Sequence, residues 1–199
     1  YPNSSDIGIE NTDIELDDRG FIKVDAQMRT SESSVFAIGD VIGAGLAHTA
    51  SHQGTIVAEI LSGHEKLVFE PRAIPNVVYT DPEIAWCGLT EQQVKEQGID
   101  CKVARFPWSA SGRATAVGRN EGLTKLLIDP ANDRILGVGI SGNNAGELIA
   151  EGVIAVEMAA LASDIQLSIH PHPTLSETFM EAAEVYYGQS PHMYTQRHN

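Results

Sequence analysis

The stretch His170-Pro171-His172-Pro173-Thr174-Leu175-Ser176-Glu177 decides how the end of this chain folds. Each proline fixes its own φ angle and pushes the residue before it toward extended geometry. We therefore expect His170 and His172 to lie two residues apart on the same side of a stiff extended segment. Thr174 with Glu177 three residues later forms a T-x-x-E capping box, which predicts that a helix begins here.

A helix is predicted to follow this turn. Its apolar residues repeat at helical spacing, namely Leu175, Phe179, Ala182, Ala183 and Tyr186, and Gly188 is the expected stop. The turn then delivers the His172 imidazole, and the helix start delivers the Glu177 carboxylate five residues later. Because a carboxylate on one ring nitrogen fixes the histidine tautomer and makes the other nitrogen more basic, this pair is a candidate for acid/base chemistry.

General sequence patterns allow two other interpretations of these residues. Glu177 could serve only as a helix cap while His172 fills the turn, because capping boxes are common. His170 and His172 could instead be metal ligands, but two histidines are too few without a third ligand at a recognisable spacing. We therefore predict no metal site in this chain.

Composition and charge exclude several classes of function. The 199 residues carry a net charge of −14 without any block of lysine or arginine, which argues against nucleic acid or an anionic membrane as partner. A hydrophobic share of 42% supports a real core, in one domain or two small ones. No apolar run reaches membrane length, since Glu157 interrupts the best one, Val153 to Ala162. No signal peptide is visible, and Tyr1 is not a natural start, so a fragment is expected.

The two cysteines, Cys87 and Cys101, are predicted to be inert thiols. Their spacing fits neither a C-x-x-C redox pair nor a zinc site. Cys87 ends an apolar run and Cys101 stands at a strand start, so both should be buried or half-buried. This usage is typical of a reducing compartment, and it provides no obvious disulfide for electron transfer.

A cofactor site is predicted near the end of an early strand. The apolar run Val35 to Ile38 stops at Gly39-Asp40, as a buried parallel strand does at a ligand crevice. Asp40 could accept hydrogen bonds from sugar-like hydroxyls. The amides from Gly45 to His48 could face a group that becomes negative, with help from the dipole of the helix that follows. A plain strand-to-helix turn with a solvated Asp40 is the alternative.

The helix after this loop is predicted from about Leu46 to Ser62, with Gly63 as its stop. One face should carry its small and apolar residues, namely Ala47, Ala50, Gly54, Val57, Ala58 and Leu61. Upstream, residues 17–20 are predicted to form a turn, and Phe21, Ile22 and Val24 a short strand.

The pattern changes from about Pro71, so a domain boundary is expected near Glu70. Strands are predicted at residues 77–79, 84–86, 102–106, 124–128 and 134–140, and helices at residues 90–97 and 146–161. Thr90 and Gln93 provide a capping box for the first of these helices. Strands in meander order with helices grouped around them predict an α+β fold.

One motif is rejected as a nucleotide site. Residues 137–142 fit G-x-G-x-x-G, but the first two glycines fall inside the apolar strand and no acidic residue follows at a strand end. We interpret these glycines as places where another element packs closely.

The segment H-P-H-P-T-L-S-E resembles the C-terminal signature of the dihydrolipoamide dehydrogenases, within the pyridine nucleotide-disulfide oxidoreductase family. Relatives that reduce glutathione carry a similar His-Pro-Thr-x-x-Glu without the first His-Pro unit. The resemblance implies that His172 is the acid/base catalyst and that Glu177 orients it.

A second resemblance covers the predicted cofactor loop. Thr30 to Asp40 is similar to the second FAD-binding motif of the same family, which implies that Asp40 contacts the ribityl chain. Gly45, Leu46, Ala47 and His48 match the segment that meets the flavin pyrimidine ring, in a loop one residue shorter and with glycine in place of the usual methionine. Residues 1–70 are then the C-terminal part of an FAD-binding α/β domain. Residues 71–199 are the interface (dimerisation) domain, with an antiparallel sheet and flanking helices.

The implied function is the oxidation of protein-bound dihydrolipoamide, with FAD as cofactor and NAD as acceptor. The resemblance implies a homodimer that serves the lipoyl-bearing acyltransferase core of a 2-oxo acid dehydrogenase complex, in the cytoplasm or, in a eukaryote, the mitochondrial matrix. The NAD domain and the redox cysteine pair lie N-terminal in the family, so the fragment alone is expected to be inactive. The alternatives are a glutathione reductase-like enzyme and a non-catalytic dimerisation module.

Overall fold

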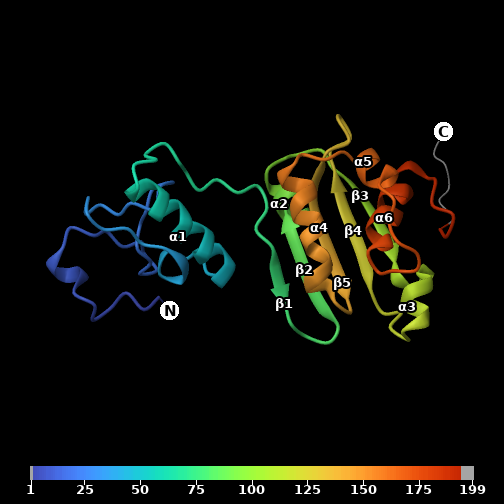
Figure 1. Cartoon of the computed structure of the whole chain (residues 1–199), viewed down its shortest axis with the longest axis horizontal. Coiled ribbons are helices and arrows are strands. Elements are labelled where there is room, and N and C mark those ends of the chain that lie inside the picture. The colour runs from blue at the N-terminus through green and yellow to red at the C-terminus, as the bar shows by residue number, and fades with distance from the viewer. Residues whose placement is uncertain (1, 194–199) are drawn as a thin grey trace. The chain divides into compact units, whose positions relative to one another are not determined.

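The computed structural model describes residues 2–193 and divides the chain into two compact units, Tyr1–Pro71 and Arg72–Asn199. Loops and one long helix, α1 (Ala47–Leu61), make up the first unit, whereas the second is built on a β-sheet covered by helices (Figure 1). None of the helices within residues 2–193 combines the length and the apolar character that a membrane span requires.

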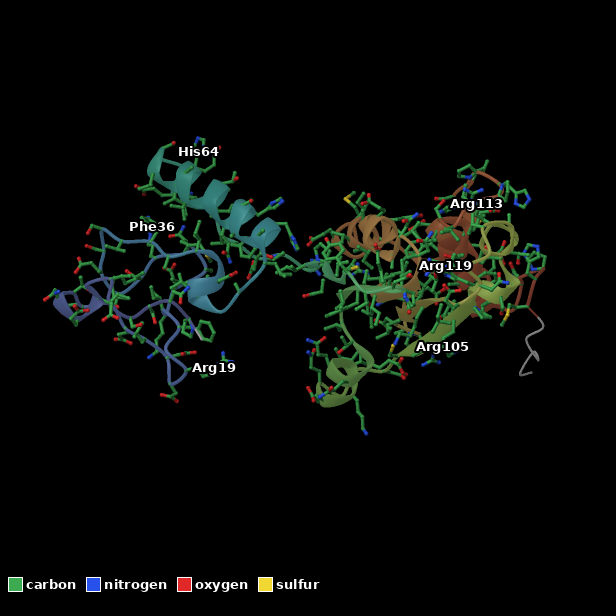
Figure 2. The ribbon with its side chains drawn as sticks, turned by 90° about the horizontal axis from the view of Figure 1, so that it is seen from below. Arg19, Phe36, His64, Arg105, Arg113 and Arg119 are labelled. Carbon is green, nitrogen blue, oxygen red and sulfur yellow. The ribbon has the colours of Figure 1, made fainter. Side chains whose placement is uncertain are left out.

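The first unit is held by turns and side-chain contacts. It contains two short 3-10 helices, η1 (Ile9–Asn11) and η2 (Gly39–Ile42), in addition to α1. The predicted turn at residues 17–20 is present, since the Gly20 amide donates to the Asp17 carbonyl at 2.9 Å. The guanidinium of Arg19 lies over the ring of Phe21 at 5.1 Å from its centre, and that of Arg29 lies 4.8 Å from the ring centre of Phe36. Figure 2 labels Arg19 and Phe36 in this unit.

The expected strands of this unit do not form. Among residues 2–71, β-pairing is limited to the isolated bridges Leu16–Ile22 and Arg29–Phe36. A buried parallel strand needs a partner on each side for its backbone groups. Among residues 2–71, the run Val35 to Ile38 has a single β-bridge, from Phe36 to Arg29, and Ile38, which lies near Gly54 of α1, is 37% exposed.

Helix α1 has the predicted extent, and Gly63 follows it with a left-handed φ of 101°. Its predicted buried face is wrong, because the buried residues are Thr49, Gln53 and Ile60, whereas Leu61 is exposed. A hydrogen bond explains the difference. The Gly39 amide donates to Oε1 of Gln53 at 2.7 Å, so a polar side chain occupies the inner face.

The second unit contains a five-stranded antiparallel sheet. Its strands are β1 (Asn76–Val78), β2 (Glu83–Gly88), β3 (Lys102–Pro107), β4 (Leu123–Ile128) and β5 (Ile135–Gly142). The spatial order is β1-β2-β5-β4-β3, so the predicted strands are confirmed but the simple meander is wrong. Strand β2 pairs with β5 instead of β3, with Gly88 opposite Gly137. A Cβ on Gly88 would lie 2.4 Å from the Leu136 carbonyl oxygen, so this close pairing requires glycine.

The helices of the second unit are α2 (Glu91–Glu96), η3 (Trp108–Ala110), α3 (Gly112–Ala116), α4 (Ala145–Glu157), α5 (Ala162–Leu167) and α6 (Glu177–Tyr187). Helix α4 packs on β2 and β5, and α6 packs on β3 and β4 beside α5 (Figure 1). The capping box of Thr90 and Gln93 is present at the start of α2.

The predicted helix at residues 146–161 ends early, at Glu157. Ala159 has a left-handed φ of 52°, and the Ile135 amide donates to the Ala160 carbonyl at 3.0 Å. The chain after Glu157 therefore leaves the helix to pair with the start of β5. The carboxylate of Glu157 accepts the amides of Arg72 and Ala73, which fixes the start of the unit to α4.

The glycines of the rejected motif lie in β5, where they make room for neighbours. A Cβ on Gly137 would lie 2.0 Å from the Leu89 carbonyl oxygen, and one on Gly142 would lie 2.3 Å from the Trp108 ring. The interpretation of close packing is therefore confirmed. The thiols also behave as predicted: burial raises the pKa of Cys87 to about 12 and also raises the pKa of the half-buried Cys101.

Candidate active site

The turn before α6 contains both hydrogen bonds of the predicted capping box. The Thr174 amide donates to Oε2 of Glu177 at 2.7 Å, and the Glu177 amide lies 3.4 Å from the Thr174 hydroxyl. Thr174 also donates through its hydroxyl to the Pro171 carbonyl at 2.7 Å, which closes the turn. The helix itself begins at Glu177 with Ser176 as its N-cap, so the predicted start at Thr174 is wrong by two residues, and the two capping-box hydrogen bonds close the turn before the helix. Gly188 ends the helix with a left-handed φ of 66°.

The second oxygen of Glu177 faces the imidazole of His172. Oε1 lies 2.9 Å from Nδ1 of His172. An ionised carboxylate only accepts hydrogen bonds, so Nδ1 is the donor and Nε2 carries the free lone pair. The His172 side chain is 75% exposed and that of Glu177 only 18%, so a well-anchored carboxylate orients an accessible base. Glu177 thus accepts the Thr174 amide with one oxygen and meets Nδ1 of His172 with the other.

His170 does not share a side with His172, and neither residue lies in a strand. The His170 side chain is only 7% exposed. Its Nδ1 lies 2.8 Å from the Ser168 carbonyl, and its Nε2 lies 2.7 Å from Oε1 of Glu151 on α4. Because the chain bends at His172-Pro173, the two imidazoles meet different partners, and His170 ties the turn to α4. Within residues 2–193, no three side chains of a type that binds metal are gathered into a site.

A cavity of about 180 Å³ lies beside this pair. Its lining includes His172, Glu177 and Thr178, together with the Ser111-Gly112 end of α3. It also includes a second imidazole–carboxylate pair, in which Nδ1 of His192 lies 2.5 Å from Oε1 of the buried Glu181. No sequence pattern indicated this second pair, because Glu181 lies on the helix and His192 in a tail without any recognisable motif.

A buried set of hydrogen bonds beneath the turn was also missed. The indole of Trp108 donates to the Thr124 hydroxyl, which bonds to the Thr178 hydroxyl, and Thr178 bonds to the Leu175 carbonyl. These partners are separated by as many as 54 residues in the chain, so no local pattern predicts them.

The candidate cofactor residues of the first unit are close to one another. Asp40 is exposed in η2, and a Cβ on Gly45 would lie 3.5 Å from Oδ1 of Asp40. Leu46 is the N-cap of α1 and provides no side-chain hydrogen bond to the first turn, which contains Ala47 and His48. A carboxylate that accepts hydrogen bonds and the amide end of a helix are therefore adjacent here. A ligand that carries hydroxyl groups and a group that becomes negative could use both.

The family follows from comparison with known proteins. Residues 74–183 match the pyridine nucleotide-disulphide oxidoreductase dimerisation domain, and residues 2–54 match the pyridine nucleotide-disulphide oxidoreductase family. The chain belongs to this family. The expected antiparallel sheet with flanking helices of the dimerisation domain is thereby confirmed, and the expected end of an FAD-binding domain corresponds to the family match over residues 2–54.

Individual relatives show which members of the family this chain is similar to. The chain is 48% identical over 188 residues to a dihydrolipoyl dehydrogenase of Haemophilus influenzae, covering 94% of this chain and 39% of that protein. A dihydrolipoyl dehydrogenase of Geobacillus stearothermophilus is 46% identical, with 98% and 41% covered. The HOCl-induced flavoprotein disulfide reductase RclA from Escherichia coli has a TM-score of 0.85 at 26% identity, over 93% of this chain and 43% of that one. The chain thus spans about two fifths of the length of the curated relatives it matches.

Proposed function

We propose that this chain is the C-terminal part of a flavin disulfide oxidoreductase that oxidises protein-bound dihydrolipoamide, with NAD as the final acceptor. One observation carries the proposal: His172 presents a free Nε2 because Glu177 occupies its Nδ1 at 2.9 Å. The identity of 48% to a dihydrolipoyl dehydrogenase supports the substrate.

The role of His172 in this reaction is to remove a thiol proton. Oxidation of the dithiol to a disulfide releases two electrons and two protons, and NAD takes up both electrons with one of the protons. A thiol and an imidazole with ordinary pKa values make the first transfer uphill by about 2.7 kcal/mol. The Glu177 carboxylate stabilises the imidazolium that forms, which offsets part of this barrier.

Asp40 and residues 45–48 would hold part of the FAD. Asp40 would accept hydrogen bonds from the ribityl hydroxyls, and the backbone at Gly45 to His48 would face the pyrimidine edge of the ring. The bound flavin would supply the electron transfer between the substrate and NAD.

The active protein is proposed to be a homodimer. Large apolar side chains are exposed on α4, at its C-cap, on α5 and in the loop after α5, namely Ile154, Met158, Leu167 and Ile169. Their burial against a second copy would stabilise a dimer. The proposed partner is the lipoyl-bearing acyltransferase core of a 2-oxo acid dehydrogenase complex, and the free Cys87 and Cys101 fit a reducing compartment such as the cytoplasm.

A substrate assay tests this proposal against a second candidate. The fold is shared with other flavoprotein disulfide reductases, so a glutathione reductase-like activity is the alternative. The full-length protein that carries this chain is expected to reduce NAD with dihydrolipoamide and to leave oxidised glutathione untouched. Turnover of oxidised glutathione without any oxidation of dihydrolipoamide would replace the proposal with the alternative.

A further inference from the structure

Three buried side chains connect the core of the second unit to the turn that carries His172. They are Trp108 at the start of η3, Thr124 in β4 and Thr178 in the first turn of α6, and each is at most 1% exposed. The indole Nε1 lies 3.0 Å from the Thr124 hydroxyl. The two hydroxyls lie 2.7 Å apart, and the Thr178 hydroxyl lies 2.7 Å from the Leu175 carbonyl.

These groups form a row that runs from Trp108 through Thr124 and Thr178 to the Leu175 carbonyl. The chemistry of its groups determines which one donates in each hydrogen bond. The Leu175 carbonyl can only accept, so Thr178 uses its single proton there. Thr124 must then donate to Thr178, and the indole, which can only donate, fills the acceptor position of Thr124. Each donor thus has one acceptor, and removal of any hydroxyl leaves a buried polar group without its partner.

The indole is fixed in place by the residues around it. A Cβ on Gly122 would lie 2.5 Å from the Trp108 ring, and one on Gly142 would lie 2.3 Å from it. The backbone of both glycines is therefore in contact with the ring. The row starts from a rigid part of the core and ends at Leu175, which lies between Thr174 and Glu177, the two residues of the capping box.

We propose that Thr178, with Thr124 and Trp108 behind it, is a positioning residue that holds the Leu175 segment so that Glu177 engages Nδ1 of His172. The catalytic part of this inference rests on the proposed function; the positioning part does not. Loss of the Thr178 hydroxyl leaves the Leu175 carbonyl with only the Thr178 amide, at 3.1 Å, and removes the hydrogen bond that ties this segment to Thr124 of β4. The turn can then move relative to the sheet. The Glu177 carboxylate can then no longer bind the Thr174 amide and Nδ1 of His172 at the same time. The tautomer of His172 is therefore no longer fixed.

The positioning claim is tested on the 199-residue chain by the ring ¹⁵N chemical shifts of His172, which report the tautomer. We expect the Nδ1–H form in the wild-type chain and in Thr178→Ser, which keeps the hydroxyl. Thr178→Val should increase the share of the Nε2–H form. The matched control is Ile149→Val, a buried substitution on α4 that shortens a core side chain without touching the row.

A second variant keeps the test decisive if Thr178→Val does not fold. Trp108→Phe retains an aromatic ring but removes the indole N–H, so it should shift the tautomer in the same direction by a smaller amount. An unchanged tautomer in whichever of the two variants folds would overturn the inference. So would an equal shift in Ile149→Val, since the effect would then reflect general loosening of the core.

The catalytic consequence is measured in the full-length protein. We expect kcat for dihydrolipoamide to fall roughly three- to ten-fold in Thr178→Val at an unchanged KM, and to recover in Thr178→Ser. A full-length wild type that does not oxidise dihydrolipoamide would contradict the proposed function alone, since the tautomer shift would still occur. A tautomer shift with unchanged kcat would overturn the link between positioning and turnover.

Discussion

Substitution of Glu177 by glutamine separates its two roles. In the structure, Oε2 accepts the Thr174 amide at 2.7 Å and Oε1 faces Nδ1 of His172 at 2.9 Å. A glutamine has one accepting oxygen and one donating NH2 group, so it can satisfy only one of these partners with the original polarity. The carboxylate is only 18% exposed, so water does not readily replace the lost partner.

The preferred arrangement of the side chain in Glu177→Gln follows from this geometry. If the amide oxygen stays on the Thr174 N–H, the NH2 group donates to Nδ1 of His172, and the imidazole carries its proton on Nε2. That tautomer cannot accept a proton from a thiol through Nε2. We therefore expect turnover of dihydrolipoamide to fall about ten-fold or more, which corresponds to at least about 1.4 kcal/mol in the barrier. Because glutamine is accepted in a capping box, the free energy of unfolding should change by about 1 kcal/mol or less.

The assay combines turnover of the full-length protein with thermal unfolding and the ring ¹⁵N shifts of His172. The expected result is reduced turnover, a nearly unchanged Tm and a change from the Nδ1–H to the Nε2–H form. Unchanged turnover with an unchanged tautomer would refute the reasoning and reduce Glu177 to a helix cap.

Four further outcomes are expected. The chain alone should sediment as a dimer at micromolar concentration, and Met158→Glu, at the exposed C-cap of α4, should yield monomers. Gly142→Ala should lower the free energy of unfolding by about 3 kcal/mol in a denaturant titration, because its Cβ would lie 2.3 Å from Trp108. Cys87 should resist alkylation at pH 8 until the chain unfolds, since burial raises its pKa to about 12. Burial and the neighbouring Glu181 raise the pKa of Glu184, so the fold favours its protonated form and loses stability as the pH rises through that pKa. Glu184→Gln should therefore raise Tm at pH 8 but not at pH 4.

Two of these outcomes have a control residue in the same chain. Gly112→Ala meets no atom within 4 Å, so it should leave the free energy of unfolding nearly unchanged. Cys101 is half-buried and should be alkylated before Cys87. A wild-type monomer at micromolar concentration, a tolerated Gly142→Ala, equal labelling of both thiols or an equal gain in Tm at both pH values would each contradict the corresponding prediction.

Local patterns were sufficient wherever neighbouring residues determine the structure. The capping box at Thr90, the stop at Gly188 and the strands of the second unit depend on residues close in sequence, and all are present. The hydrogen bonds between Thr174 and Glu177 also form, but in the turn before α6, whose N-cap is Ser176. The pairing of His172 with Glu177 is also local, because a capping box already brings the carboxylate back over the turn.

Partners far apart in sequence explain what could not be predicted. The buried face of α1 depends on Gln53 meeting Gly39, and the early end of α4 depends on Ala160 meeting Ile135. The row from Trp108 to Thr178 joins residues of η3, β4 and α6, so no periodic sequence pattern predicts it. The run Val35 to Ile38 has the composition of a strand, but residues 2–71 provide it with no ladder partner beyond a single bridge.

The most direct test of the account is the reductive half-reaction of the full-length protein with His172→Gln, followed by stopped flow. The account predicts that dihydrolipoamide reduces this variant at least about a hundred-fold more slowly than the wild type, because no base removes the thiol proton. Reduction of the same variant by NADH, which does not require deprotonation of a substrate thiol, should proceed at the wild-type rate. A wild-type rate with dihydrolipoamide would show that His172 does not carry the proton transfer and would contradict the account.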